Sequence, residues 1–266
     1  RRFTTGKTAT VNCAQNVAVN GGGATIIING TFDPGNFQVT GGASMTVNSG
    51  GVLVVSKSTF SGNFGTSGGK TLNVASTVTY AASGAQTIDQ TLSYGNLVLS
   101  TGGTKSAGGN LTIRNNFTIN AGVTCNGGTA TLTISGNIVN NGTFNPNTGT
   151  VALNGAANTS ITGQTTFNVL TVNKASSTTS VTLGSSVTVG TLNMTLGTMS
   201  TGNNSVTITS NRSGSGIILG TIVRQHTFTN ATSYAFEGQN NTITFTSPVG
   251  ITSVTVSVVQ NPPSDF

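Results

Sequence analysis

Four acidic residues and one histidine are the side chains of this chain that could carry acid–base chemistry. A β-helical enzyme that cleaves a polysaccharide needs two carboxylates close together, or carboxylates with a calcium ion and a basic residue, on neighbouring coils. Even the closest two acids, Glu237 and Asp265, are well separated in the sequence. Asp33 and Asp89 are farther apart and could still stack on one face, although no motif marks them as a pair. Asp33 stands in an Asp-Pro-Gly turn, which its side chain is expected to cap.

His226 is the only histidine, and it could act as a general base with Glu237 as the group that orients it. It alternates with Arg224 and Phe228, a pattern that favours the solvent face of a strand instead. Serine is abundant, but without a second histidine it is expected to cover strand surfaces rather than to act as a nucleophile. We therefore predict no catalytic residues and no enzymatic activity.

The two cysteines, Cys13 and Cys125, are far apart in the sequence. In a solenoid of roughly twenty residues per coil they would lie several coils apart, too far for the geometry of a disulfide. Two cysteines cannot bind zinc without further ligands, and His226 lies far beyond Cys125 in the chain. We expect each cysteine to be a small buried residue of the core, and we predict no metal site and no cofactor.

The chain is basic, with a formal net charge of +6. A nucleic-acid footprint would need cations gathered in a stripe with aromatic partners. The ten cations are instead dispersed, and only the first two are adjacent: Arg1, Arg2, Lys7, Lys57, Lys70, Lys105, Arg114, Lys174, Arg212 and Arg224. We attribute the positive charge to the scarcity of acids and expect no nucleic-acid partner. Because no apolar run is long enough to span a bilayer, we also expect no membrane-spanning segment.

The elements that would position these side chains are predicted to be short β-strands. Apolar residues alternate with Thr and Ser in segments bounded by Gly, Asn and Ser, as at 150–153, 181–183 and 206–209. Such alternation places one side of a strand in a core and the other in solvent. Charged residues make up only 5% of the chain, and Val, Ile, Thr and Phe are favoured over helix formers. We therefore predict an all-β chain with almost no helix, since the alternation is too regular for disorder.

A repeat of about 73 residues runs through the middle of the chain. Residues 77–100 align with 150–173 without a gap, so that Ile88 meets Ile161 and Leu97 meets Leu170. Later pairs of matching segments are separated by a slightly different number of residues, a difference that loops of varying length would explain. A unit that recurs with loops of varying length is typical of a solenoid, whose coils bury their apolar faces against one another. The predicted fold is an elongated parallel β-helix, or β-solenoid.

Two regions are predicted along the chain. The solenoid occupies residues 1–211, with N-terminal coils over 1–76 and two repeat blocks of about 73 residues over 77–211. Residues 212–266 contain longer strands with turns, such as the one at Glu237, that suit antiparallel hairpins. We interpret them as an antiparallel β cap or the start of a β-sandwich-like domain, followed by a linker at 261–266 that contains two prolines.

Three segments carry a resemblance to known proteins: those at 142–155, 161–174 and 187–204, the first of which reads Gly142-Thr-Phe-Asn-Pro-Asn-Thr-Gly-Thr-Val-Ala-Leu-Asn-Gly. They resemble the repetitive β-solenoid stalks of large bacterial surface proteins exported by type IX secretion. In those proteins a segment like 220–229 followed by 233–236 closes the solenoid, so the resemblance covers about residues 77–259. It implies a non-enzymatic role in adhesion or surface structure, and it brings no catalytic residues. A secreted, extracellular or cell-surface location is also expected from the start at Arg-Arg-Phe, as in a processed chain or a fragment.

Three classes of function follow. The first is an extracellular structural or adhesive solenoid, either the stalk of a large surface protein or the subunit of a surface filament. The alternative is a carbohydrate-binding or carbohydrate-cleaving β-helix, which predicts a groove lined with aromatic residues and acids. The third is an ice-binding solenoid, which requires Thr-X-Thr motifs such as 77–79, 207–209 and 242–244 in register on one flat face.

The ends of the predicted solenoid suggest its partners. Terminal coils expose unpaired N–H and C=O groups, which natural solenoids cap or use to bind another strand. We expect the chain to continue into a further domain of the same protein or to join copies of itself end to end by β-augmentation. Surface glycans are a further expected partner of an adhesive chain.

Overall fold

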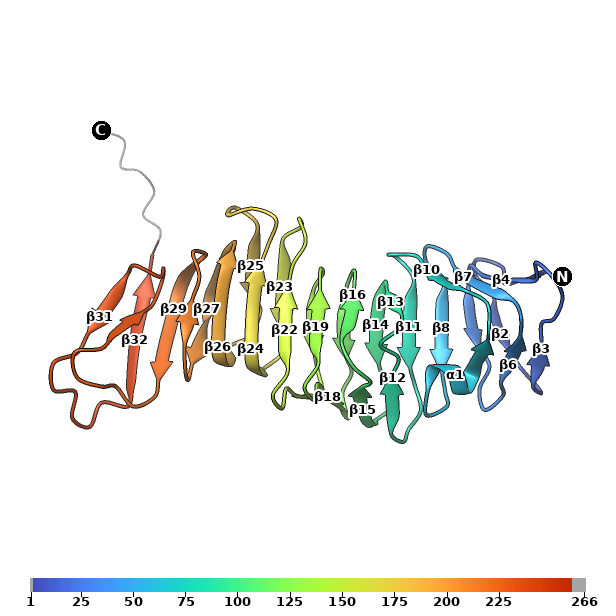
Figure 1. Cartoon of the computed structure of the whole chain (residues 1–266), viewed down its shortest axis with the longest axis horizontal. Coiled ribbons are helices and arrows are strands. Elements are labelled where there is room, and N and C mark those ends of the chain that lie inside the picture. The colour runs from blue at the N-terminus through green and yellow to red at the C-terminus, as the bar shows by residue number, and fades with distance from the viewer. Residues whose placement is uncertain (1, 260–266) are drawn as a thin grey trace.

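The computed structural model describes residues 2–259. Strands make up 53% of the chain and helix 2%, and the strands form a parallel β-solenoid of about 11 turns with a small antiparallel sheet near the C-terminus (Figure 1). The prediction of an all-β, β-helical fold is therefore confirmed. Each turn, called a coil below, carries short strands on three faces, and strands of successive coils pair in parallel along these faces.

The three faces are named in the order in which the chain meets them. The first face contains β1 (Arg2–Thr4), β4 (Thr25–Ile28), β7 (Ser44–Val47), β10 (Lys70–Leu72), β13 (Ser93–Tyr94), β16 (Leu111–Ile113), β19 (Thr131–Ile134), β22 (Thr150–Leu153) and β28 (Arg212–Ser213). The second contains β2 (Thr10–Asn12), β5 (Thr31–Asp33), β8 (Val52–Val55), β11 (Thr77–Tyr80), β14 (Asn96–Leu99), β17 (Phe117–Ile119), β20 (Ile138–Asn140), β23 (Thr159–Thr162) and β25 (Ser180–Leu183). The third contains β3 (Val17–Ala18), β6 (Val39–Gly41), β9 (Phe64–Thr66), β12 (Gln86–Ile88), β15 (Gly103–Ala107), β18 (Val123–Asn126) and β21 (Thr143–Asn145).

Later strands are longer because they bend around a corner and serve two faces. β24 (Thr165–Asn173) and β26 (Val187–Leu196) pass from the third face to the first, as their pairing with one another and with β22 and β28 shows. β27 (Thr198–Ile208) and β29 (Ile217–Gln225) pass from the second face to the third. A four-residue helix, α1 (Phe60–Asn63), lies between the second and third faces of an early coil, and the side chain of Thr59 caps it by accepting from Gly62 N at 3.0 Å.

Inward side chains stack into apolar columns because adjacent coils pair in register. The second-face column runs through Leu53, Val78, Leu97, Phe117, Ile138, Ile161 and Leu183. On the first face, Leu170 lies between Val151 and Leu192. Leu97, Ile161 and Leu170 are all 0% exposed, which confirms their predicted place in the core. Burying a side chain of this kind contributes roughly 1.5–3 kcal/mol, so the columns are the main source of stability in a chain with so few charges.

The repeat of about 73 residues is not a structural period. The length of a coil varies, since Val206 pairs with Ile222 in a short coil and Val52 pairs with Thr77 in a longer one. Thr77 lies on the second face in β11, whereas its sequence match Thr150 lies on the first face in β22. The two blocks predicted over 77–211 thus match strands on different faces, because all faces share one alternation of apolar and hydroxyl residues.

The solenoid also extends past the predicted boundary at residue 211. β28 pairs in parallel with β26, and β29 with β27, so the coils continue to Gln225. The length of β29 suggested a hairpin arm, but it is long because it crosses a corner of the last coil. Antiparallel structure begins after Gln225, where β32 (Ser253–Val258) pairs with β29, and β30 (Ser233–Ala235) pairs with β31 (Thr242–Thr244). Residues 226–259 are called the cap below, and the linker predicted at 261–266 lies outside the described residues.

Candidate functional site

The structure keeps the acids apart. Asp33 ends β5 on the second face, where its Oδ1 accepts from Gly35 N at 2.8 Å and from Ser56 Oγ at 3.1 Å, which confirms that it caps its turn. Asp89 follows β12 of the third face and accepts from Thr91 N at 2.8 Å. The two carboxylates therefore belong to different faces and do not stack. Glu237 lies in the cap and accepts from the side-chain amide of Asn241, while Asp265 lies outside the described residues.

The prediction for the surroundings of His226 is wrong. Arg224 and Phe228 are 3% and 4% exposed, so the alternation marks a buried side rather than a solvent face. The reason is that the chain turns into the cap after Gln225 and covers this side of β29. His226 Nε2 lies 3.2 Å from an Arg224 guanidinium nitrogen, and its ring packs on Phe228 and Tyr234 at 4.6 and 5.0 Å between centroids. No hydrogen bond joins His226 to Glu237 among the described residues, so the proposed base and its orienting group are not brought together.

Cysteine and metal-ligating residues are likewise dispersed. Cys125 is fully buried, as predicted, whereas Cys13 is only partly buried, and both are free thiols. Within residues 2–259 the structure contains no group of three or more His, Cys, Asp or Glu side chains close enough to hold a metal ion. The same residues include no helix with the length and hydropathy that crossing a membrane would require.

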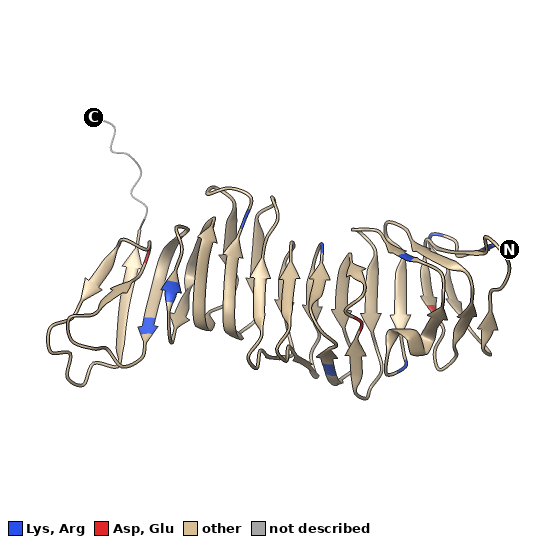
Figure 2. Ribbon diagram, in the orientation of Figure 1, with Lys and Arg blue, Asp and Glu red and all other residues tan. Residues whose placement is uncertain are grey.

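Among residues 2–259, four cations are buried, a feature that the sequence did not indicate: Lys105, Lys174, Arg212 and Arg224. Their partners are main-chain carbonyl oxygens rather than carboxylates, as where Lys174 Nζ donates to Asn154 O at 2.6 Å. Burial lowers the pKa of both lysine side chains below the ordinary value of 10.5. Figure 2 shows Lys and Arg at separated places along the rod, so the described cations form no stripe that would fit a nucleic-acid backbone.

The two buried arginines end apolar columns of the solenoid. Arg212 is paired in register with Leu192 on the first face, and Arg224 with Ile208 on the third. From these inward positions they reach into the cap: Arg212 donates to Glu237 O at 2.6 Å, and Arg224 donates to Ala235 O at 3.2 Å. The arginines therefore attach the cap to the last coil through hydrogen bonds to carbonyl groups of the cap.

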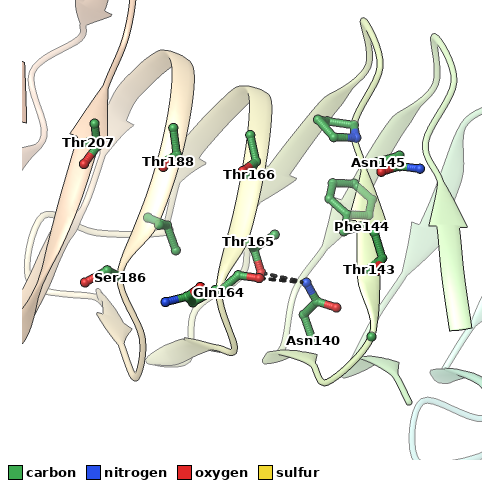
Figure 3. Close-up of a pocket in the computed structure, with 13 residues that line it drawn as sticks. Asn140, Thr143, Phe144, Asn145, Gln164, Thr165, Thr166, Ser186, Thr188 and Thr207 are labelled. Atoms are coloured by element: carbon green, nitrogen blue, oxygen red, sulfur yellow. Dashed lines mark hydrogen bonds between the residues drawn. The ribbon is translucent and has the colours of Figure 1, made fainter. Parts of the chain in front are cut away.

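A pocket of about 720 Å³ opens on the third face, and it is the best candidate site among the described residues (Figure 3). Its walls come from β21, β24, β26 and β27, which belong to consecutive coils. The lining is rich in hydroxyl and amide side chains, among them Thr143, Asn145, Gln164, Thr166, Thr188 and Thr207. Lys, Arg, His, Asp and Glu are all missing from this lining.

The third-face ladder is interrupted between β9 and β12 and again between β21 and β24, and the pocket lies at the second of these breaks. β21 pairs with β18 on one side, and the first residues of β24 pair with β26 on the other, but β21 and β24 share no ladder. The same two coils are joined normally on the other faces, by β20 with β23 and by β22 with β24. The coils are thus held together on two faces and open on the third, which leaves one side of β21 and one side of the first residues of β24, 165–167, without a strand partner among the described residues.

Another interruption in the solenoid is filled by a side chain. The first-face ladder breaks between β10 and β13, which belong to separate runs of paired strands. The guanidinium of Arg114 reaches across this break and donates to Leu72 O and to Ser93 O, the latter at 3.2 Å. The pocket lining contains no arginine, so the break on the third face is not filled in this way.

Asn140 bridges the third-face interruption from inside. It points inward at the end of β20 and is 5% exposed. Its Nδ2 donates to Gln164 O and to Thr165 Oγ1, both at 3.1 Å, and Thr165 Oγ1 in turn donates to Gly163 O at 3.0 Å. Because a carbonyl oxygen can only accept, these bonds fix the orientation of the amide.

The amide oxygen of Asn140 is left without a partner. This buried Oδ1 accepts no hydrogen bond from any residue that the structure describes. Asn63, another buried asparagine, provides the contrast, because its Oδ1 accepts from Ser56 N and Lys57 N while its Nδ2 donates to two carbonyl oxygens. Leaving a buried acceptor unpaired costs about 1–3 kcal/mol, so Asn140 marks a place where hydrogen bonding is incomplete.

The Thr-X-Thr motifs do not lie in register on one face, as an ice-binding surface would require. The three Thr-X-Thr motifs lie apart, with 77–79 on the second face, 207–209 at the third face and 242–244 in the cap. On the first face, the outward column reads Ser93, Thr112, Thr133, Ala152, Thr171, Asn193 and Ser213. The neighbouring outward column includes Val169, so no regular double row of threonine runs along this face.

Comparison with known proteins returns no match: no protein family fits this chain, and neither does a curated protein or a solved structure. The chemistry of the site therefore has to be inferred from its own residues.

Proposed function

We propose that this chain is a non-enzymatic extracellular solenoid with a structural or adhesive role, as the stalk of a large bacterial surface protein or a subunit of a surface filament. The supporting observation is the continuous stacking of about 11 coils, which the second face carries without interruption from β2 to β29. At 4.7–4.9 Å per stacked strand, such a stack gives a rod of about 50 Å. Rods of this kind act as spacers and offer extended surfaces for contact.

The surface chemistry supports a passive rather than a catalytic role. Outward positions carry mainly Thr, Ser and Asn, and the described carboxylates lie on different faces or in the cap. Carbohydrate cleavage by a pair of acids would need two carboxyl groups roughly 5–9.5 Å apart across one bond. We therefore propose that any carbohydrate this chain meets is bound and not cleaved.

The two ends of the rod differ, and this bears on its partners. At the N-terminal end, β1, β2 and β3 each pair with one strand only, and the partly buried Phe3, Val11 and Val17 line a hollow of about 180 Å³. At the other end, the cap covers the last coil. We propose that the N-terminal end is where a further domain of the same protein, or a second copy, adds strands by β-augmentation.

Localisation and shape test this proposal directly. Antibodies raised against the chain should label intact cells that produce the full-length protein as strongly as permeabilised ones. Electron microscopy of the purified chain should show short rods if it is a stalk and long fibres if it is a filament subunit. Labelling that requires permeabilisation would overturn the extracellular assignment.

A second measurement tests the non-enzymatic assignment. The purified chain should release no reducing ends from common polysaccharides. Turnover that disappears in Asp89→Asn would promote the alternative, a carbohydrate-cleaving β-helix, because Asp89 is one of the few described acids.

A further inference from the structure

We propose that the third-face pocket between β21 and β24 is a binding site for a neutral glycan. This inference rests on the proposed adhesive role, for which it supplies the ligand class. Its volume of about 720 Å³ lies within the range of roughly 300–1,000 Å³ that is usual for small-ligand sites. That volume would accommodate a short oligosaccharide segment.

The charge of the lining selects the class of ligand. Recognition of a carboxylate, sulfate or phosphate group relies on Arg or Lys, and recognition of a cation relies on acids. The pocket is lined by neither kind of side chain. Its lining of Thr, Ser, Asn and Gln side chains provides both donors and acceptors, which is the complement of a neutral sugar whose hydroxyl groups also donate and accept.

The hydroxyl groups are arranged in a row. Thr166 is paired in register with Thr188, and Thr188 with Thr207, so the three lie in successive coils along the solenoid (Figure 3). Stacked strands place such side chains about 4.7–4.9 Å apart. A linear glycan lying along this row could contact several coils at once, which a single small molecule could not do.

The interruption of the ladder supplies the remaining hydrogen-bonding capacity. Asn140 holds its amide in one orientation through Gln164 and Thr165, and its Oδ1 accepts no hydrogen bond from the described residues. This buried oxygen lies beside the gap, whose walls carry the unpaired backbone N–H and C=O groups of β21 and of the first residues of β24. Sugar hydroxyl groups can donate to such carbonyl groups and accept from such N–H groups, directly or through water.

Aromatic stacking contributes little to this site. Phe144 is the one aromatic residue in the lining, and it is 8% exposed because its ring packs on Phe167 at 6.0 Å between centroids. Binding should therefore depend on hydrogen bonds to the row of threonines. The expected affinity is modest, and repeated contacts along a surface polysaccharide would raise it through multivalency.

The test is binding of neutral and charged oligosaccharides to the purified chain and to matched variants. The probes are tetrasaccharides of β-1,4-linked glucose, α-1,4-linked glucose, mannose and N-acetylglucosamine, with sulfated and uronic-acid oligosaccharides for comparison. Thr188→Val and the double variant Thr166→Val/Thr188→Val remove hydroxyl groups from the row and keep the branched shape. Thr182→Val is the control, because Thr182 is exposed on the second face at the neighbouring strand β25 of the same coil.

We expect at least one neutral probe to bind, and the double variant to weaken it by about tenfold, since a hydrogen bond to a neutral partner is worth roughly 0.5–1.5 kcal/mol. Thr182→Val should bind as the unmodified chain does. Circular dichroism and chemical shifts of distant residues verify that each variant is folded.

Three results would overturn the inference. These are no binding of any neutral probe, binding of the charged probes alone, and neutral binding that the double variant leaves unchanged. Each would leave the structural role standing, because surface labelling and rod shape are measured separately. Release of cleaved products from a bound probe would contradict the non-enzymatic role while leaving the pocket assignment intact.

Discussion

Replacing Leu170 by alanine should destabilise the middle of the solenoid far more than its ends. Leu170 is 0% exposed and stacks between Val151 and Leu192. Backbone ladders hold β22, β24 and β26 at fixed spacing on both sides, so the resulting cavity cannot close easily. Leucine-to-alanine changes at such sites cost about 2–5 kcal/mol, and we expect about 3 kcal/mol or more here. Leu170→Asp should cost more still, because it also buries a carboxyl group without a partner.

Urea unfolding and amide hydrogen exchange together measure this effect. Because each coil contacts only its neighbours, exchange should accelerate in β22, β24 and β26 and stay slow in β4 and β7. Thr171→Ala is the control, since Thr171 faces outward on the same strand and its loss should change stability by no more than about 0.5 kcal/mol. The account of stacked columns would be refuted if Leu170→Ala lowered the free energy of unfolding by less than about 1 kcal/mol, well under the usual range for such a change. Faster amide exchange along the whole rod would refute it as well.

Buried polar groups give three further predictions. Arg212→Gln should loosen residues 233–244 of the cap from the last coil, because the guanidinium hydrogen bond of 2.6 Å to Glu237 O is lost, while β32 stays paired with β29. Unchanged protease resistance of residues 233–244 would contradict this. The free energy of unfolding should fall as the pH rises above 10, because burial raises the pKa of Tyr80 and Tyr94 above 10.0, so that these phenols ionise first in the unfolded chain. The fall should be smaller in Tyr94→Phe. An equal fall in this variant would show that Tyr94 does not cause the pH dependence. A thiol-reactive probe should modify the partly buried Cys13 and spare Cys125, because burial raises the pKa of the Cys125 thiol to about 12. Two rapidly reacting thiols in the folded chain would show that Cys125 is not buried.

The alternation of residues was sufficient to predict the fold and much of the core. Leu97, Ile161 and Leu170 lie at inward positions because apolar residues at every second place can share a core only on one side of a strand. The alternation alone could not predict on which face of the solenoid each strand lies. All three faces carry the same alternation, so a good alignment such as Thr77 with Thr150 can join strands that face different directions.

The candidate site was harder to predict than the fold. Its signal is one polar residue in an apolar column, where Leu99 and Ile119 are followed in register by Asn140. Asn140 can be recognised as a polar member of an apolar column only once the register between coils is known, because polar residues at strand ends are common throughout this chain. The burial of Arg212 and Arg224 was missed for a related reason, since charged side chains are ordinarily placed on the surface.

The interrupted third face connects stability with the proposed binding. Ladders on two faces hold the coils of β21 and β24 together, so the solenoid tolerates a gap that leaves the Asn140 oxygen unpaired. A ligand that fills this gap binds the folded chain and not the unfolded one. It should therefore stabilise the chain by about 2.7 kcal/mol at a concentration of about 100 times its Kd. The quasi-one-dimensional contacts of a solenoid confine that gain to neighbouring coils. A bound neutral glycan should accordingly slow amide exchange in β20, β21 and β24 and leave β4 and β7 unchanged, a pattern that nonspecific adhesion to the hydroxyl-rich surface would not produce.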